Sequence, residues 1–107
     1  PYTVEFNGNE SLGRYRGLAK VLNLDATNEK EASFALAAAM RDLMREVNLP
    51  TSLKEAGIDR RRFEELLPTI VDHADVDPNI VQSLRIPATE EIEQLLLYAY
   101  AGKRVDF

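Results

Sequence analysis

The sequence predicts an all-α fold, in which five or six helices form an antiparallel, bundle-like array. Apolar residues recur at three- and four-residue spacing along most of the chain, which is the helical period. No strand pattern longer than residues 2–6 occurs, and no internal repeat interrupts the helical signal. At 107 residues, the chain suits a single helical domain with one modest core.

The N-terminal part begins with seven residues, 1–7, that we interpret as the tail of an element whose start is missing, since the chain opens without Met. A helix is expected over residues 10–22, because apolar residues there share one face: Leu12, Tyr15, Leu18, Ala19 and Leu22. Gly13 and Gly17 should weaken this helix and permit the close approach of a neighbouring backbone.

The longest helix is expected over residues 27–47, and it pairs with the helix before it as the unit 10–47. Thr27 or Asn28 can cap it, and acidic residues follow at its positive end. Its apolar residues form one stripe: Ala32, Ala35, Leu36, Ala39, Met40, Leu43 and Val47. Because further apolar residues widen this stripe, we expect the helix to be covered on more than one side.

The C-terminal helices occupy residues 51–107. Thr51 should cap a single turn that Gly57 closes, and Asp59 should cap a helix over 60–74. Pro68 lies inside this helix and should kink it or split it, because proline lacks the amide hydrogen.

Residues 75–87 are expected to be irregular, with a possible helical turn at 78–81. Thr89 should cap the last helix, and Gly102 should end it. The buried face of this helix is expected to contain Ile92, Leu95, Leu96, Ala99 and Tyr100. We expect Tyr98 and Tyr100 to be half-buried, with their hydroxyls in water.

Composition excludes several classes of protein. The formal net charge of −5 disfavours nonspecific binding to nucleic acid, even though Arg60, Arg61 and Arg62 are adjacent. Three successive helical residues point in different directions, so we expect a solvated face with local ion pairs. No apolar run is long enough to span a membrane, and the absence of cysteine fits a cytoplasmic protein.

Local chemistry indicates no active site. His73 is the only histidine, and a metal site would require it to converge with Asp72, Asp75 and Asp77. A surface histidine at the C-terminal end of a helix is the simpler interpretation. Glu90, Glu91 and Glu93 could resemble an acid–base pair, but they are more simply explained as partners of the helix dipole. We therefore predict no catalytic, cofactor-binding or metal-ligating residue.

The second half of the chain contains several short motifs whose order is informative about the protein family. A leucine-proline-x-x-leucine run at 49–53 leads into Gly57, and Asp77 and Arg85 follow it. The segment Thr89-Glu-Glu-Ile92 comes next, and the sequence Ala-Tyr-Ala-Gly-Lys occupies residues 99–103. This order resembles the C-terminal helical domain of the iron-dependent (group III) alcohol dehydrogenases, a fold of the dehydroquinate synthase-like type. Residues 1–7 resemble the end of that family's histidine-glycine…leucine-proline…phenylalanine-asparagine segment. The resemblance covers essentially the whole chain.

This resemblance implies a parent enzyme that transfers a hydride between NAD(P) and an alcohol–aldehyde pair. It also implies Fe²⁺ or Zn²⁺ ligands upstream of Pro1, a missing N-terminal nucleotide domain and upstream helices as partners. The segment itself would be structural and inactive, with no cofactor of its own. Many members of the family have cysteine near the substrate at the position of Asn79, so Asn79 is a candidate pocket-lining residue.

An alternative reading is a free-standing helical protein-interaction module that binds a partner through an open apolar face. If the upstream helices of a parent enzyme are absent, the widened stripe on 27–47 loses a partner. Because large exposed apolar patches promote association, we expect self-association or low stability of the chain alone.

Overall fold

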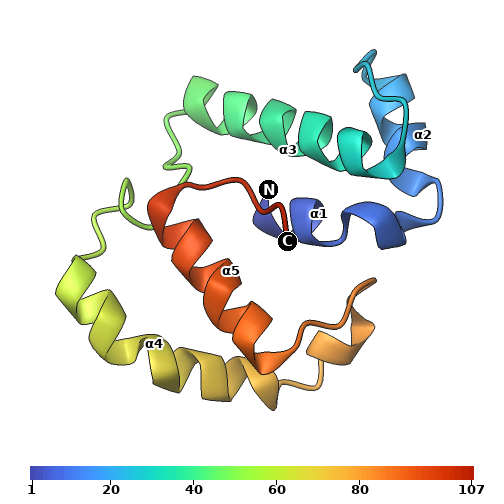
Figure 1. Cartoon of the computed structure of the whole chain (residues 1–107). Coiled ribbons are helices and arrows are strands. Elements are labelled where there is room, and N and C mark those ends of the chain that lie inside the picture. The colour runs from blue at the N-terminus through green and yellow to red at the C-terminus, as the bar shows by residue number, and fades with distance from the viewer. The chain divides into compact units, whose positions relative to one another are not determined.

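The structure is a computed structural model that describes residues 1–107 and contains only helices. In chain order they are α1 (Tyr2–Phe6), η1 (Gly8–Ser11), α2 (Arg14–Val21), α3 (Glu29–Glu46), α4 (Arg60–Asp75), η2 (Ile80–Gln82) and α5 (Thr89–Ala101), where η marks a 3-10 helix (Figure 1). This confirms the predicted all-α class. The chain divides into two compact units, which are residues 1–49 with 104–107 (unit 1) and residues 50–103 (unit 2).

The start of unit 1 is helical, because α1 forms one short turn and η1 follows it directly. The single helix predicted over 10–22 is wrong, since Leu12 and Gly13 both adopt left-handed backbone conformations that interrupt it. The predicted close approach at Gly13 and Gly17 is also wrong. A Cβ atom at either glycine would meet no neighbouring atom within 4 Å.

The long helix α3 follows its prediction closely at both ends. The Asn28 side chain caps it by accepting a hydrogen bond from the Glu31 amide at 2.9 Å. Glu31 reaches back to accept hydrogen bonds from the Thr27 hydroxyl and amide, and these bonds hold the pKa of Glu31 below its ordinary value of 4.5. After the helix, Asn48 adopts a left-handed conformation that ends it.

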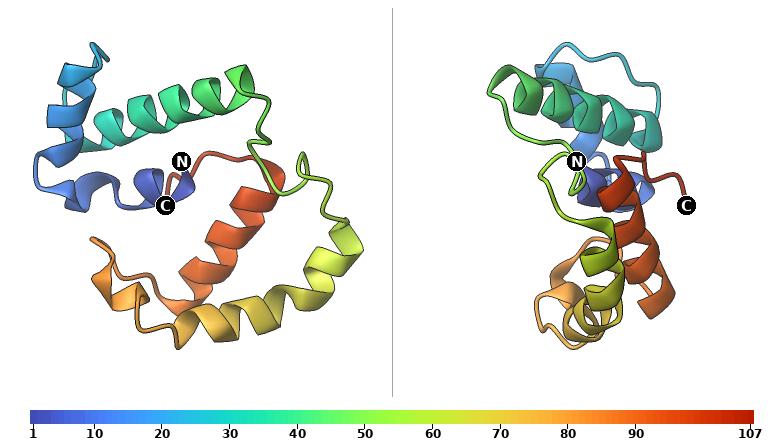
Figure 2. Two further views of the ribbon diagram at one scale, coloured as in Figure 1. Left: turned by 180° about the vertical axis from the view of Figure 1, so that it is seen from behind. Right: turned by 90° about the vertical axis from the view of Figure 1, so that its left-hand side faces the viewer.

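The core of unit 1 covers only part of the predicted stripe on α3. Ala32, Leu36 and Ala37 are buried, together with Phe6, Ala19 and Val105. Met40, Leu43 and Val47 remain exposed, so the C-terminal part of the predicted stripe is not covered within this unit. Within this unit, α1 lies alongside α3 in both views (Figures 1 and 2).

The C-terminal tail belongs to unit 1, although it follows the last helix of unit 2. Val105 is almost completely buried, and the Phe107 ring lies 6.0 Å from the Phe6 ring. The Arg104 guanidinium stacks over the Phe34 ring at 4.5 Å, which is a cation–π distance. The tail therefore closes the core of unit 1.

Among the glycines of unit 1, only Gly8 has a close neighbour. A Cβ atom there would lie 3.0 Å from the Ser33 hydroxyl, which itself donates a hydrogen bond to the Lys30 carbonyl. We expect Gly8→Ala to destabilise the protein by about 1–3 kcal/mol, because the added methyl group overpacks this contact. Urea denaturation should show that Ser33→Ala recovers part of this loss. Equal losses with and without Ser33→Ala would contradict the assigned contact.

Unit 2 begins with the predicted turn. The Thr51 amide and hydroxyl both donate to Glu55, and Gly57 closes the turn in a left-handed conformation. Asp59 then caps α4 by accepting from the Arg62 amide at 2.9 Å. Of the two predicted outcomes at Pro68, a kink or a split, the split does not occur, because α4 continues through this residue without a break. Figure 1 shows that the axis of α4 bends along its length.

The start of α5 differs from its prediction by one residue. Ala88 is the N-cap, and its amide donates to the Glu91 carboxylate at 2.9 Å. Thr89 is the first helical residue rather than the cap, because its hydroxyl donates to Asp75 at 3.0 Å. Gly102 ends the helix in a left-handed conformation, as predicted.

The core of unit 2 lies between α4 and α5. Its buried members are Phe63, Leu67, Val71, Ile92 and Tyr100. The Phe63 and Tyr100 rings stack with their centroids 4.5 Å apart. The Tyr100 hydroxyl donates to the Ile58 carbonyl at 3.1 Å, so the prediction that this hydroxyl is in water is wrong.

Candidate functional site

Asn79, the predicted pocket-lining residue, lies in the turn before η2. It lines an open pocket of about 270 Å³ together with Ala74, Asp77 and Ile80. The Asn79 amide and side-chain nitrogen both donate to one carboxylate oxygen of Asp77, at 2.8 and 2.9 Å. This pair of bonds orients the carboxamide, so the pocket presents one fixed polar group beside the apolar side chains of Ala74 and Ile80.

His73 is exposed in the last turn of α4. The acidic side chains near it have separate partners, since Asp75 accepts from Thr89 and Asp77 accepts from Asn79. No group of three or more histidine, cysteine, aspartate or glutamate side chains is placed to hold a metal ion.

The three adjacent arginines at the start of α4 form local ion pairs, as predicted. Arg60 pairs with Glu64 at 2.7 Å, and Arg61 pairs with Glu65 at 3.0 Å. Arg62 reaches Glu65 at 3.6 Å from the other side. These exposed pairs balance part of the positive charge of the run and draw the three guanidinium groups along the helix, so no convergent site for an anion forms.

The acidic residues at the start of α5 have structural roles. Glu91 accepts a hydrogen bond from the Ala88 amide and forms an ion pair with Arg85. Glu90 and Glu93 are exposed. An acid–base pair would need two carboxyl groups that face a common substrate position. Glu91 instead binds Arg85 and Ala88, which precede α5 in the sequence.

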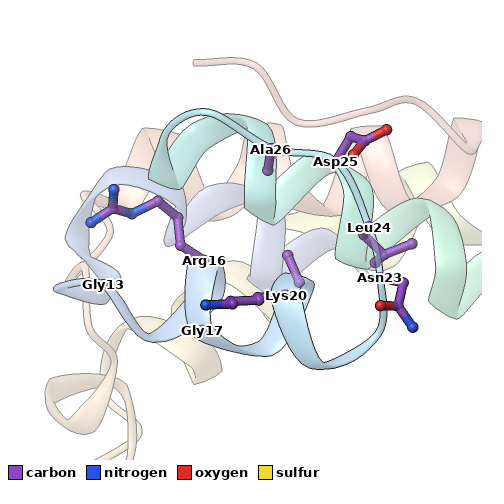
Figure 3. A pocket seen from close by; sticks show the side chains of 9 residues that line it. Gly13, Arg16, Gly17, Lys20, Asn23, Leu24, Asp25 and Ala26 are labelled. Carbon is purple, nitrogen blue, oxygen red and sulfur yellow. The ribbon is translucent and has the colours of Figure 1, made fainter.

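A second pocket, of about 610 Å³, lies beside α2 in unit 1 (Figure 3). Arg16, Lys20, Asn23 and Asp25 supply its polar lining, and Gly13 and Gly17 lack the side chains that would fill it. Figure 3 shows that the labelled charged side chains point in different directions rather than toward one centre. The Arg16 guanidinium also forms an ion pair with Glu29 at 3.0 Å. This hollow therefore presents scattered charges and no convergent binding group.

The most deeply buried charges were missed by the sequence analysis. The Glu5 carboxylate is completely buried and binds both terminal nitrogens of Arg41, at 2.5 and 2.9 Å. It also accepts a hydrogen bond from the Val105 amide at 3.0 Å, so it joins α1, α3 and the C-terminal tail. The bonds to Glu5 raise the pKa of Arg41 above its ordinary value. The only sequence signal was one glutamate within an otherwise apolar or uncharged run, Tyr2 to Phe6.

Arg41 has further contacts that fix its position. Its guanidinium lies 4.9 Å from the centre of the Tyr2 ring, which is within the range of a cation–π contact. Its remaining nitrogen, Nε, is buried without a hydrogen-bond partner. The Glu5–Arg41 pair belongs to unit 1, and neither residue lines either of the pockets described above. It therefore acts as a structural link.

None of the helices has the length and the apolar composition that crossing a membrane would require. The longest, α3, carries charged residues along its length.

Comparison with known proteins gives consistent matches along the chain. A family model described as "Fe-containing alcohol dehydrogenase family, C-terminal" matches residues 1–100. The NADPH-dependent butanol dehydrogenase of Clostridium saccharobutylicum is 30% identical over 107 residues, which are 100% of this chain and 28% of that protein. The aldehyde-alcohol dehydrogenase of Clostridium acetobutylicum is 28% identical over 90 residues, which are 84% of this chain and 10% of that protein.

Proposed function

Because the chain belongs to the Fe-containing alcohol dehydrogenase family, we propose that it is the C-terminal helical part of a dehydrogenase that transfers a hydride between NAD(P) and an alcohol–aldehyde pair. The match of the family's C-terminal model to residues 1–100 carries this proposal. The names of the two relatives support an alcohol or aldehyde substrate, and that of the butanol dehydrogenase supports a nicotinamide cofactor.

The residues of this chain do not fit the metal that the family name implies. His73 is exposed and no acidic or histidine group converges with it. We therefore assign no step of the reaction to a metal held by these residues. In the proposed enzyme, the ligands for iron and the nucleotide-binding groups belong to the rest of the polypeptide. These helices supply a packed structural wall, and Asn79 faces the substrate side.

The test compares the full-length polypeptide with the 107-residue chain. With iron, NADPH and butyraldehyde, we expect the full-length protein to oxidise the nicotinamide, followed by its absorbance. We expect the 107-residue chain to show no such activity and no stoichiometric iron or zinc by elemental analysis. One tightly held metal per 107-residue chain would overturn the structural role. A metal-loaded full-length protein that is inactive on a panel of alcohols and aldehydes would overturn the proposed reaction.

The alternative function is a free-standing helical interaction module, and the exposed apolar side chains of unit 1 favour it. Such a module would act without any nucleotide-binding segment. The two functions therefore differ in what the gene encodes before residue 1. A histidine-glycine motif there, with a glycine-rich nucleotide segment farther back, would support the dehydrogenase and exclude the module.

Substitution of Asn79 should change substrate recognition by the full-length enzyme. In the full-length enzyme, we expect Asn79→Ala to change KM for the alcohol by about threefold to tenfold, since it removes a fixed polar group from the pocket wall. The melting temperature should change little, because Asn79 is exposed. Asn9→Ala, at an exposed residue of unit 1, is the control. Equal kinetic constants for Asn79→Ala and Asn9→Ala would show that Asn79 does not line the substrate pocket.

A further inference from the structure

The pocket beside Asn79 combines two apolar side chains with one carboxylate and one carboxamide. Ala74 and Ile80 are half-buried and pack against the buried cluster between α4 and α5. Backbone hydrogen bonds fix the turn between them, since the Asp77 amide donates to the Ala74 carbonyl at 3.2 Å and the Ile80 amide donates to the Asp77 carbonyl at 3.0 Å. The apolar wall of the pocket is therefore held by the core of unit 2, whereas Asp77 and Asn79 are exposed beside it.

The orientation of the Asn79 carboxamide follows from the chemistry of Asp77. One carboxylate oxygen of Asp77 accepts from both the backbone amide and Nδ2 of Asn79. Because a carboxylate only accepts hydrogen bonds, the nitrogen of the carboxamide must face it, and Oδ1 lies on the side away from Asp77. Gln82 Nε2 lies 3.5 Å from Oδ1, which is the outer limit of a hydrogen bond. Oδ1 and the second Nδ2 hydrogen of Asn79 therefore keep the capacity to bind a ligand.

The free groups of this carboxamide are complementary to a hydroxyl group. A hydroxyl both donates and accepts hydrogen bonds, so it can pair with Oδ1 or with Nδ2 of Asn79. A methyl group in the same position can pair with neither and would leave the carboxamide without the partner that water supplied. A carboxylate on the ligand would instead meet the like charge of Asp77. The pocket therefore suits a neutral, hydroxylated carbon chain.

We propose that the full-length dehydrogenase prefers alcohols that carry a second hydroxyl group, which Asn79 binds while Ala74 and Ile80 contact the carbon chain. This inference rests on the proposed function and adds the substrate class, which is neutral diols and hydroxyaldehydes rather than simple alkanols. Asp77 is a positioning residue, since it acts by holding the carboxamide of Asn79. The reaction is the same for both classes, because the carbinol carbon gives a hydride to NAD(P)⁺ and its hydroxyl group releases a proton.

Pairs of alcohols of equal size test this preference in the full-length enzyme with iron and NADP⁺. The pairs are 1-propanol with ethylene glycol, 1-butanol with 1,3-propanediol, and 1-pentanol with 1,4-butanediol, and each exchanges the terminal methyl group for a hydroxyl. The measured quantity is the ratio of kcat/KM for the diol to kcat/KM for the alkanol. We expect the diol to be the better substrate in at least one pair. Asn79→Leu should lower that ratio by about threefold to tenfold, since it removes one hydrogen-bonding group of similar size.

Further variants test the role of Asp77 and provide the control. Asp77→Ala should lower the same ratio, whereas Asp77→Asn should keep most of it, because an asparagine oxygen still accepts from Asn79. Asn9→Leu makes the same chemical change at an exposed residue of unit 1 and should leave the ratio unchanged. An enzyme that oxidises alkanols, but whose ratio Asn79→Leu does not alter in any pair, would overturn the preference and leave the proposed reaction standing. Inactivity of the full-length enzyme on every alcohol and aldehyde would overturn the proposed reaction, and this inference with it.

Discussion

Arg41→Ala should lower the free energy of unfolding by about 3–5 kcal/mol, because it leaves the Glu5 carboxylate buried without a cation. The side chain of Glu5 has no exposed surface and that of Arg41 is 13% exposed, so water cannot replace the lost partner. The same carboxylate also holds the Val105 amide, so its rearrangement would loosen the C-terminal tail. Urea denaturation, followed by circular dichroism, measures the change.

The control for this prediction is an exposed pair on the same helix. Arg45 and Asp42 form an ion pair at 2.8 Å, but their side chains are 61% and 70% exposed. We expect Arg45→Ala to cost no more than about 0.5–1 kcal/mol, since exposed pairs are screened by water. The double variant Glu5→Leu with Arg41→Met should recover much of the loss, because it removes both buried charges together. Similar losses for Arg41→Ala and Arg45→Ala would show that the buried pair does not hold unit 1 together.

Phe63→Ala should destabilise unit 2 by about 3–5 kcal/mol, because it removes a large buried ring and leaves a cavity between α4 and α5. The Phe63 ring stacks on Tyr100, and both belong to the buried cluster of this unit. Tyr100→Phe keeps the stacked ring and removes only the hydrogen bond to the Ile58 carbonyl. We expect that smaller change to cost about 1 kcal/mol.

Leu97→Ala provides the matched control for the core of unit 2. Leu97 lies on the same helix as Tyr100 but is 40% exposed, so its truncation creates no closed cavity. We expect a loss below about 1.5 kcal/mol, measured by the same denaturation experiment. A Phe63→Ala variant that unfolds at the same urea concentration as Leu97→Ala would contradict the assigned core.

Local signals in the sequence were sufficient to predict most helix ends. Asn28 and Asp59 cap the helices as predicted, and Gly57 and Gly102 end their elements in left-handed conformations. These features depend on bonds between residues three or four apart, which the local sequence specifies. The prediction failed at Leu12, where a leucine adopts the left-handed conformation next to Gly13. Helical spacing does not predict this break, because the apolar residues keep the helical period across Leu12 and Gly13.

The family, too, could be recognised from the order of short motifs, although each motif is weak by itself. The candidate site at Asn79 came from that resemblance, and its spacing from Asp77 agrees with the turn that joins them. By contrast, no sequence pattern pairs Glu5 with Arg41, since any acidic residue could have met any basic one. The same limit applies to the pocket beside α2, which depends on how α2 and the loop that follows it are arranged in space.

The amino-acid sequence alone thus determined the all-helical class, the caps and stops of the helices, and the family. It did so because these properties arise from neighbouring residues and from their order along the chain. Only the tertiary structure decided which apolar and charged side chains are buried. Glu5 meets residues 36 and 100 positions away, and the stripe on α3 is covered only where α1 and its neighbours reach it. Burial depends on which distant segments meet, and helical periodicity carries no information about that pairing.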